Sequence, residues 1–516
     1  MKKLLLADFY PAALGGLVAI AAAILLRTLI GTRLLAELVL DAMLGVLPGE
    51  GFSTLLGVFG PYGKALFFAS TLLGILVFYV VVWARLKRRV GPSREAVTRL
   101  AVLAAIASFA LLLLAGIVLV VFTDAVLRNT SWFEYALVTA LTSGLFASIA
   151  GLQTLSATAS EYDRLSVDAP PASSSRRHAL QLVPGLALGG LAMVVIARTL
   201  RDAAGGGVQS SHRGQPTQPV TPTEEFYVIS KNLIDPQVDG SKWALHVSGL
   251  VGNRVDLSYD EFVAFPAQEQ YTTMQCISNY VGDELIGNAL WRGVPLNQVL
   301  ARAGLSAGAS HVLFRCADGY TVSLPIDFAL RDQVVLAYQM NGAPLTDKHG
   351  YPVRLLSPGI YGMMHPKWIT DILVMNEEVL GYWQQQGWSQ EARMNTSIRI
   401  DLPADGSRIG PEPYLVEGIA FSGDRGISRV EVSTDGGETW SDARLKPPLG
   451  PYTWVLWDFA WTPPRDFAGR VSVQARATDG DGVLQTAEES SPYPNGATGY
   501  HIVDVTVEEQ VRAESS

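Results

Sequence analysis

This chain of 516 residues contains two cysteines, Cys276 and Cys316, and they are its best candidates for metal binding or thiol chemistry. No CxxC pair or Cys/His cluster surrounds either one, so a zinc or iron–sulfur site is not supported. Cys316 ends the apolar run VLFRC, which is typical of a core residue, whereas Cys276 lies in the polar, loop-like run TTMQCISNY. A thiolate in such a loop suits a soft or high-valent transition metal. A disulfide between the two cysteines is the alternative in an oxidising compartment.

Short alternating strands must position these cysteines. From residue 226 onward, runs such as WALHVSGLV, YTVSLPI and VVLAYQM are separated by Gly, Asp and Asn turns, with fewer helical stretches between them. This pattern predicts an α+β domain over 225–395. From residue 397 the pattern becomes purely β, with about seven strands at intervals of about 8–12 residues, as in an immunoglobulin-like sandwich over 396–508. We expect the sandwich tryptophans to fill its core or an interface, and most of them the core, namely Trp440, Trp454, Trp457 and Trp461.

The loop of Cys276 and two later segments resemble the sulfite oxidase family of molybdopterin enzymes. The resemblance is carried by MQCISN at 274–279 with GNALWRGVPL at 287–296, by HGYPVRLLSPGIYGMMHPKWI at 349–369, and by VEVSTDGGETWSDARL at 430–445. The last segment is similar to the family's dimerisation domain, which implies a homodimer through the sandwich. The resemblance covers about 225–508. It implies an oxidoreductase with one molybdenum–molybdopterin cofactor per chain and with Cys276 as the only protein ligand of the metal.

The same resemblance implies roles for other residues. Arg354 reaches the cofactor phosphate, and Tyr227 and Val228 touch the pterin. Cys316 contacts the cofactor or belongs to the core, while Asp318 and Tyr320 line the metal pocket or form a turn. Without the resemblance, Arg354 is typical of an edge-strand charge. Further cofactor contacts are implied for His349, His365, Pro366 and Lys367.

The substrate is less defined. Animal-type sulfite oxidases follow the cysteine with arginines, one of which helps to bind the sulfite anion, but here Cys276 is followed by ISNY. This departure points toward the bacterial branch that includes protein methionine sulfoxide reductases, although those enzymes usually lack the sandwich and pair with a separate haem membrane subunit. We expect a two-electron oxygen-atom transfer on a small molecule or sulfoxide, in either direction: X + H2O ⇌ XO + 2e⁻ + 2H⁺. The alternatives are a sulfite dehydrogenase, a non-catalytic binding module of the same fold, and a transporter with an outer solute-binding domain.

The first 200 residues differ in character from the rest. They hold 16 Lys and Arg against 10 Asp and Glu, whereas the remainder holds 23 against 38, within a net charge of −9. The acidic remainder lacks the clustered positive charge that nucleic acid binding needs. The segment 34–47 contains two acidic residues and is expected to lie at the membrane interface or fold back. Five other stretches are long and apolar enough to cross a bilayer: 9–31, 65–84, 99–122, 133–155 and 179–198.

The fold class is therefore multi-domain. We expect a helical transmembrane domain at 1–201, a flexible linker at 202–224, the α+β domain, the sandwich, and a tail at 509–516. With five spans, the basic loops share one side, which the positive-inside rule places in the cytoplasm. The N-terminus is then cytoplasmic and the acidic half lies outside the cytoplasm.

Two further expectations concern export and electrons. The run Ser174–Leu180, with Arg176 and Arg177, resembles a twin-arginine export signal; its alternative is a pair of positive-inside arginines. No histidine precedes His178, so we predict no haem in the helices. Electrons then pass to or from a separate partner, such as a membrane or soluble cytochrome. The helices would anchor the enzyme in the lipid bilayer or dock a membrane protein.

Overall fold

A computed structural model describes residues 2–30, 34–46, 63–87, 94–121, 132–165, 187, 190–199, 214–232, 234–463 and 467–508. Contacts divide the chain into two compact units, of which the first holds the helical residues 1–47 and 59–205 with the short segment Lys231–Ile234. The second unit holds 48–58, 206–230 and 235–516. The predicted twin-arginine run lies outside the described residues.

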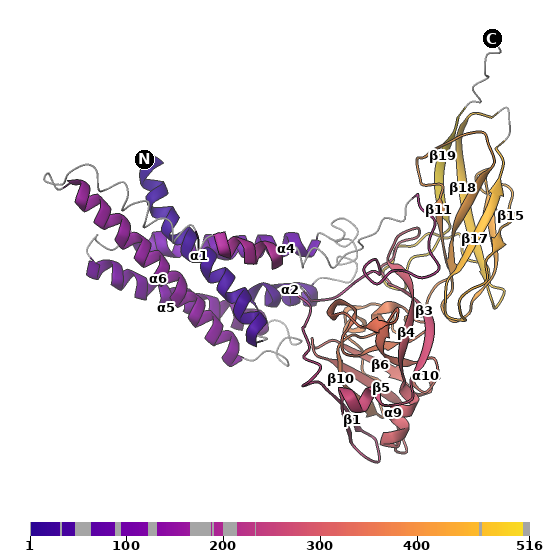
Figure 1. The fold of residues 1–516 in the computed structure, drawn as a ribbon, viewed down its shortest axis with the longest axis horizontal. Helices are drawn as coiled ribbons and strands as arrows, with labels where there is room; N and C mark the ends of the chain where they lie inside the picture. The colour runs from indigo at the N-terminus through magenta and orange to yellow at the C-terminus, as the bar shows by residue number, and fades with distance from the viewer. Residues whose placement is uncertain are drawn as a thin grey trace, which may run out of the picture. The chain divides into compact units, whose positions relative to one another are not determined.

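Apolar helices lying alongside one another make up the first unit (Figure 1). α1 packs on α4 and α6, and α5 packs on α6. Gly15 permits a close approach of two helices, because a Cβ at this position would lie 2.7 Å from the carbonyl oxygen of Phe146. The helices are α1 (Lys2–Ile30), α2 (Leu35–Val46), α4 (Gly63–Lys87), α5 (Arg94–Val121) and α6 (Trp132–Leu165).

The number of spans differs from the five predicted. Among the described residues, four helices are long and apolar enough to cross a membrane. Within the predicted span 179–198, the structure describes only a short apolar helix, Gly190–Thr199. At about 1.5 Å per residue, this helix covers roughly half of a ~30 Å hydrocarbon core. The four candidate spans are Tyr10–Arg27, Leu66–Lys87, Glu95–Ala115 and Tyr135–Thr154.

The helix α2 fills the predicted fold-back segment and is held by a buried ion pair. Arg27 Nη2 lies 2.8 Å from Glu37 Oε1, and Glu37 also accepts the N–H of Leu34 at 2.8 Å. The same guanidinium donates to the carbonyl of Ile234 at 2.9 Å. Because each charge has its partner, neither has to reach water from the apolar unit.

Two sheets build the first domain of the second unit. One has the order β2-β1-β10-β5-β6, in which β1 and β10 run parallel, and the other has the order β3-β4-β7-β8 with β9 beside β7. Gly293 lets β4 cross β7 closely at a bulge, because a Cβ there would lie 2.3 Å from the carbonyl of Leu336. The strands are β1 (Ala244–Gly249), β2 (Val255–Ser258), β3 (Gln268–Gln275), β4 (Ile286–Pro295), β5 (His311–Cys316), β6 (Thr321–Pro325), β7 (Val335–Met340), β8 (Ala343–Pro344), β9 (Arg354–Leu356) and β10 (Ile369–Met375).

Short helices connect these strands. α8 begins with a capping box in which the Ser258 hydroxyl and the Glu261 carboxylate bond each other's backbone N–H. α9 buries Leu296, Val299 and Leu300 in the core of the domain. The helices are α8 (Tyr259–Val263), α9 (Leu296–Ala303), α10 (Ile326–Ala329), η2 (Asp347–His349), η3 (Gly362–Met364) and η4 (Gln384–Gln386).

Two sheets form the C-terminal sandwich, drawn in yellow tones in Figure 1, and their strands are antiparallel except where β12 pairs with β19 in parallel. Their orders are β11-β13-β17-β16 and β12-β19-β18-β14-β15. In β18, Val471, Val473, Ala475 and Ala477 alternate into the core, as the period of two requires. The strands are β11 (Ser397–Leu402), β12 (Arg408–Ile409), β13 (Tyr414–Phe421), β14 (Ile427–Ser433), β15 (Ser441–Asp442), β16 (Arg444–Leu445), β17 (Val455–Trp461), β18 (Gly469–Asp479) and β19 (His501–Val507).

The tryptophans of this region occupy three environments. Trp457 and Trp461 fill the sandwich core, as expected. Trp454 is also buried, but it belongs to the core cluster of the preceding domain. Trp440 is half-buried, with the guanidinium of Arg476 4.0 Å from its ring centre. The interface reading thus applies to Trp454.

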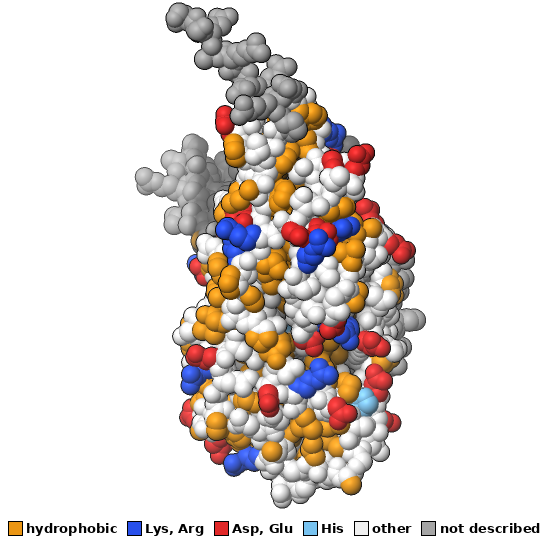
Figure 2. Space-filling model, turned by 90° about the vertical axis from the view of Figure 1, so that its right-hand side faces the viewer, with side chains coloured by type: hydrophobic (Ala, Val, Ile, Leu, Met, Phe, Trp, Pro, Cys, Tyr) orange, Lys and Arg blue, Asp and Glu red, His pale blue; other side chains and the backbone are white. Residues whose placement is uncertain are grey.

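The surface mixes charges of both signs. On the face drawn in Figure 2, Lys and Arg side chains lie beside Asp and Glu side chains and do not gather into a basic patch. Surface pairs of the sandwich show the same arrangement, for example Arg429 with Asp442 at 2.5 Å.

Residues 214–224, the described part of the predicted flexible linker, are docked on the second unit. The Thr217 hydroxyl donates to Asp401 at 2.6 Å, and Thr221 N–H donates to the carbonyl of Asn288 at 2.7 Å. The Pro219 carbonyl accepts from Asn288 Nδ2 at 2.7 Å and from Trp454 Nε1 at 3.2 Å. The polar composition predicted a flexible linker, but residues 214–224 form specific hydrogen bonds.

Asp401 generates a test of the docked segment. Its carboxylate lies 2.6 Å from Arg399 Nε, with side chains 2% and 7% exposed. Asp401→Asn should lower the free energy of unfolding by about 3–5 kcal/mol, because it leaves a buried cation without its anion. Denaturation of the full chain in detergent, followed by tryptophan fluorescence, measures this.

The matched control is Glu508→Gln. Glu508 pairs with Arg408 at 3.5 Å, with side chains 51% and 76% exposed, and its loss should cost less than about 1 kcal/mol. Equal effects of the two substitutions would contradict a stabilising role for the buried pair.

Candidate active site

Cys276 directly follows β3, in the connection to β4. Its backbone N–H donates to the carbonyl of Leu285 at 2.9 Å, and its Sγ lies 3.0 Å from the hydroxyl of Ser278. The thiol is free and 7% exposed, and its burial raises its pKa above the ordinary value. A buried thiol of this kind becomes a thiolate when a positive charge, such as a metal ion, takes the place of its proton.

Arg354 is a buried cation with no carboxylate partner among the described residues. Located at the start of β9, it is 4% exposed and donates from Nη1 to the carbonyl of His349 at 3.1 Å. Its guanidinium carbon lies 5.1 Å from the ring centre of Trp291, and its Nε is buried without a partner. Burial lowers the pKa of Arg354 to about 10, so the group still carries its charge at neutral pH.

Tyr227 adds a second unpaired polar group. Its hydroxyl is buried without a partner, and burial raises its pKa well above the ordinary value, with the Cys276 thiol adding to the rise and Arg354 opposing it. The ring stacks on Phe226 at 5.4 Å between centres. Val228, also buried, follows directly. Tyr227 therefore lies between the predicted metal ligand and the predicted phosphate ligand.

Two neutral histidines accompany Arg354. Burial, followed by the neighbouring Arg354 charge, lowers the pKa of His349 to about 4 and that of His365 to about 3. His349 Nε2 lies 2.8 Å from the carbonyl of Thr223, and His365 Nε2 lies 3.1 Å from that of Ile360. Each Nε2 therefore carries the proton, as assigned from these partners. The rings orient the loops around Arg354 without adding charge.

Pro366 and Lys367 follow His365 and make contacts near Arg354. The Pro366 carbonyl accepts the N–H of Leu355 at 2.9 Å. Lys367 donates to the carbonyl of Lys348 at 2.9 Å and lies 4.3 Å from the ring centre of Trp368. These contacts hold Pro366 and Lys367, two of the predicted cofactor contacts, beside β9 and the turn that precedes it.

The remaining candidates, Asp318, Tyr320 and Cys316, lie at and just after the end of β5. The Tyr320 hydroxyl donates to the carbonyl of Met363 at 2.7 Å, and burial raises the pKa of Tyr320 well above its ordinary value. Asp318 Oδ1 accepts the N–H of Tyr320 at 2.9 Å, which is the turn role considered from the sequence. Cys316 forms no disulfide and is a buried member of the core cluster.

Sequence reasoning missed Tyr361. Its side chain is 1% exposed, and burial raises its pKa to about 12, with the Cys276 thiol adding to the rise. The hydroxyl accepts the N–H of Asn395 at 3.1 Å. The segment HGYPVRLLSPGIYG contains this tyrosine, but nothing in the pattern shows that it folds back toward Cys276.

The donor set fits a metal cofactor that carries a phosphate. An anion would pair the buried charge of Arg354 and accept from its orphaned Nε, which the protein leaves unsatisfied. A polar ring edge would satisfy the Tyr227 hydroxyl, and Cys276 supplies one soft ligand. Among the described residues, no group of three or more His, Cys, Asp or Glu is arranged to hold a metal ion without such a cofactor.

Comparisons with known proteins agree with this geometry. The family described as "Oxidoreductase molybdopterin binding domain" matches residues 232–383, and the "Mo-co oxidoreductase dimerisation domain" matches residues 389–495. Mitochondrial sulfite oxidase of Rattus norvegicus is 33% identical over 285 residues, covering 46% of this chain and 52% of the relative. For sulfite oxidase of Gallus gallus, the identity is 32% over 308 residues, covering 50% and 66%.

Two further relatives are more distant. Nitrate reductase [NADH] 2 of Phaseolus vulgaris is 29% identical over 325 residues, covering 50% of this chain and 36% of the relative. The solved structure of the sulfane dehydrogenase SoxCD from Paracoccus pantotrophus has a TM-score of 0.51 at 23% identity. It covers 57% of this chain and 82% of that one, and shows the fold alone.

The chain spans about half the length of the curated mammalian relatives that it matches, and the helical unit lies outside the matched families. Residues 232–383 are therefore a molybdopterin-binding oxidoreductase domain and residues 389–495 a Mo-co dimerisation domain, and both are similar to the matching part of the sulfite oxidases.

Proposed function

We propose that the chain is a membrane-anchored molybdopterin enzyme that transfers an oxygen atom, with two electrons, to or from a small molecule or sulfoxide. The observation that carries the proposal is the buried, uncompensated Arg354 with its orphaned Nε, beside the orphaned Tyr227 hydroxyl, in a domain that also presents a free buried thiol. An inactive binding module would have no reason to retain this costly combination.

Each residue has a defined task in this proposal. When bound, the cofactor supplies a molybdenum centre that exchanges the oxygen atom and the electrons. Cys276 holds the metal, and the Ser278 hydroxyl at 3.0 Å donates to the thiolate. Arg354 binds the phosphate, and Tyr227 meets the pterin. Burial of these groups excludes water and strengthens every charge interaction among them.

The loop after Cys276 supports an uncharged substrate. Ile277 is buried, and Asn279 uses its side-chain oxygen to accept the N–H of Leu285 at 2.7 Å. A small, open pocket lies between this loop and the sandwich, and Arg399 lines it. Asp401 neutralises Arg399 at 2.6 Å, so an anion would find no free positive charge from this arginine.

A sulfite dehydrogenase is the second candidate, and the identity to sulfite oxidases favours it. Assays of the purified protein with sulfite, methionine sulfoxide and nitrate, each with an artificial electron carrier, separate the candidates. The electron partner is proposed to be a cytochrome, and the dimerisation domain supports a homodimer.

Metal analysis tests the role of Cys276. The purified chain should hold about one molybdenum, and Cys276→Ser should lose it, because the hydroxyl is a harder and weaker ligand. Cys316→Ser is the control and should retain the metal. A folded wild-type chain without molybdenum, purified from a host that makes the cofactor, would contradict the proposal.

Arg354 is tested by its own substitution. Arg354→Gln should release the pterin cofactor during gel filtration, because the phosphate loses the buried cation that is proposed to bind it. The exposed Arg315→Gln, in the neighbouring sheet, should leave the bound pterin unchanged. Pterin fluorescence of the denatured peak measures the content; equal retention by both variants would argue against phosphate binding by Arg354.

We also propose that the helical unit anchors the enzyme with its N-terminus in the cytoplasm and residues 214–508 outside, after export in folded form, which requires the apolar run after Arg177 to cross the membrane in addition to the four candidate spans. Arg176→Lys with Arg177→Lys should abolish the appearance of the enzyme outside, because the twin-arginine pathway requires the arginine pair. Protease added to intact spheroplasts measures this through a C-terminal tag. Unchanged tag cleavage in a strain without that pathway would refute the export route.

A further inference from the structure

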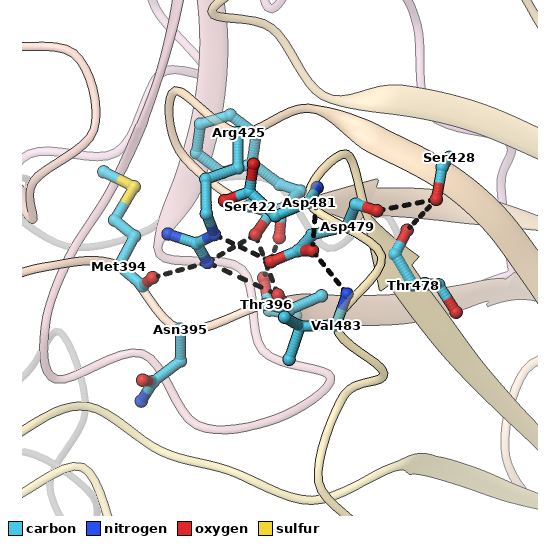
Figure 3. A network of polar contacts seen from close by, with 12 residues as sticks. Met394, Asn395, Thr396, Ser422, Arg425, Ser428, Thr478, Asp479, Asp481 and Val483 are labelled. Atoms are coloured by element: carbon cyan, nitrogen blue, oxygen red, sulfur yellow. Dashed lines mark hydrogen bonds and ion pairs between the residues drawn. The ribbon is translucent and has the colours of Figure 1, made fainter.

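A buried ion pair inside the sandwich holds an arginine that also contacts the domain containing Cys276. Arg425 lies in the turn between β13 and β14, and its Nε is 2.8 Å from Asp479 Oδ2 at the end of β18 (Figure 3). The two side chains are 12% and 3% exposed. The other oxygen of Asp479 accepts the N–H groups of Asp481 at 3.1 Å and Val483 at 2.9 Å.

The arginine of this pair reaches beyond the sandwich. Its Nη2 donates to the carbonyl of Met394 at 3.0 Å, and Met394 belongs to the core cluster of the molybdopterin domain. The same Nη2 also bonds the Ser422 hydroxyl, which lies 2.8 Å from that of Thr396 (Figure 3). Arg425 thus contacts both neighbours of Asn395: Met394 through its carbonyl, and Thr396 through the Ser422 hydroxyl.

Asn395 in turn fixes a tyrosine hydroxyl. Its N–H donates to Tyr361 Oη at 3.1 Å, and its side-chain Nδ2 donates to the carbonyls of Asn495 and Gly496, each at 3.2 Å. Gly496 has a φ of +88°, and a Cβ there would lie 2.2 Å from Tyr361 Oη. The hydroxyl therefore occupies space that only glycine leaves open.

Tyr361 is adjacent to the loop of Cys276. A Cβ on the next residue, Gly362, would lie 3.3 Å from the carbonyl of Gln275, which directly precedes the cysteine. Of the tyrosines near the thiol, Tyr320 already donates to the carbonyl of Met363. The Tyr361 hydroxyl accepts a bond from Asn395, so its own hydrogen remains for another acceptor.

On the basis of the proposed function, we propose that the sandwich domain holds the Tyr361 hydroxyl at the metal pocket, where it donates its hydrogen to an oxygen of the bound substrate or cofactor. Arg425, Asp479, Asn395 and Gly496 are positioning residues for this hydroxyl. The enzyme's site is then incomplete without the sandwich, whatever that domain does in dimerisation.

Three variants of the holoenzyme test the role of the hydroxyl. Tyr361→Phe removes it, and Gly496→Ala displaces it. Gly436→Ala is the control, because Gly436 has a similar φ of +78° but nothing within 4 Å of its added Cβ. All three should retain molybdenum. Tyr361→Phe and Gly496→Ala should change the Mo(V) EPR spectrum and lower kcat with methionine sulfoxide about a hundredfold, while Gly436→Ala changes neither.

A double-variant cycle separates positioning from mere stability. Arg425→Gln should lower both Tm and kcat. In a Tyr361→Phe background, the same substitution should still lower Tm but should leave kcat and the Mo(V) spectrum unchanged, because the hydroxyl that it positions is gone. Equal losses of kcat in both backgrounds would show that Arg425 does not act through Tyr361.

Failure of the inference differs from failure of the proposed function. A wild-type chain without molybdenum overturns both. A molybdenum-loaded wild type whose Tyr361→Phe variant has an unchanged Mo(V) spectrum, and any measured kcat within about twofold, overturns only the inference. If methionine sulfoxide is not turned over, the Mo(V) spectra alone test the inference. If Gly496→Ala fails to fold, the Tyr361→Phe variant alone tests it.

Discussion

The second unit is organised around an unpaired charge. Burying a guanidinium without an anion is among the costliest arrangements that a protein interior can hold. Here Arg354 is surrounded by backbone carbonyls, an indole ring and two histidines kept neutral by burial. No described carboxylate pairs with the charge, which is why we propose that a ligand supplies the missing anion. The loops of the fold deliver the free thiol and the Tyr227 hydroxyl to the same region.

This arrangement also explains why the sandwich packs against the site. Trp454, although it lies just before a sandwich strand, packs into the core of the molybdopterin domain. Arg425 and Asn395 join the two domains through backbone carbonyls and N–H groups. Contacts of this kind hold position more tightly than apolar packing alone, because each depends on direction. The two domains behave as one body around the thiol.

Local pattern and motif resemblance predict a large part of this structure. The alternating strands, the sandwich and the buried position of Cys316 follow from periodicity and spacing, as in β18. The position of Tyr361 did not follow, because it depends on a contact with Asn395, 34 residues away. The structure describes four candidate spans and not five, because within 179–198 it describes only residue 187 and part of the short helix Gly190–Thr199. The linker prediction does not hold for its described part, 214–224, because composition does not show that Thr217 meets Asp401.

The docked segment 214–224 has a practical consequence for separating the enzyme from its helices. Its Pro219 carbonyl is a shared acceptor for the Asn288 amide and the Trp454 indole, one from each soluble domain's part of the chain. A cut at residue 225 would remove this acceptor, so both donors would lose their partner at once and the contact between the domains would weaken. A version without the helical unit that keeps the fold should therefore begin before Gly214.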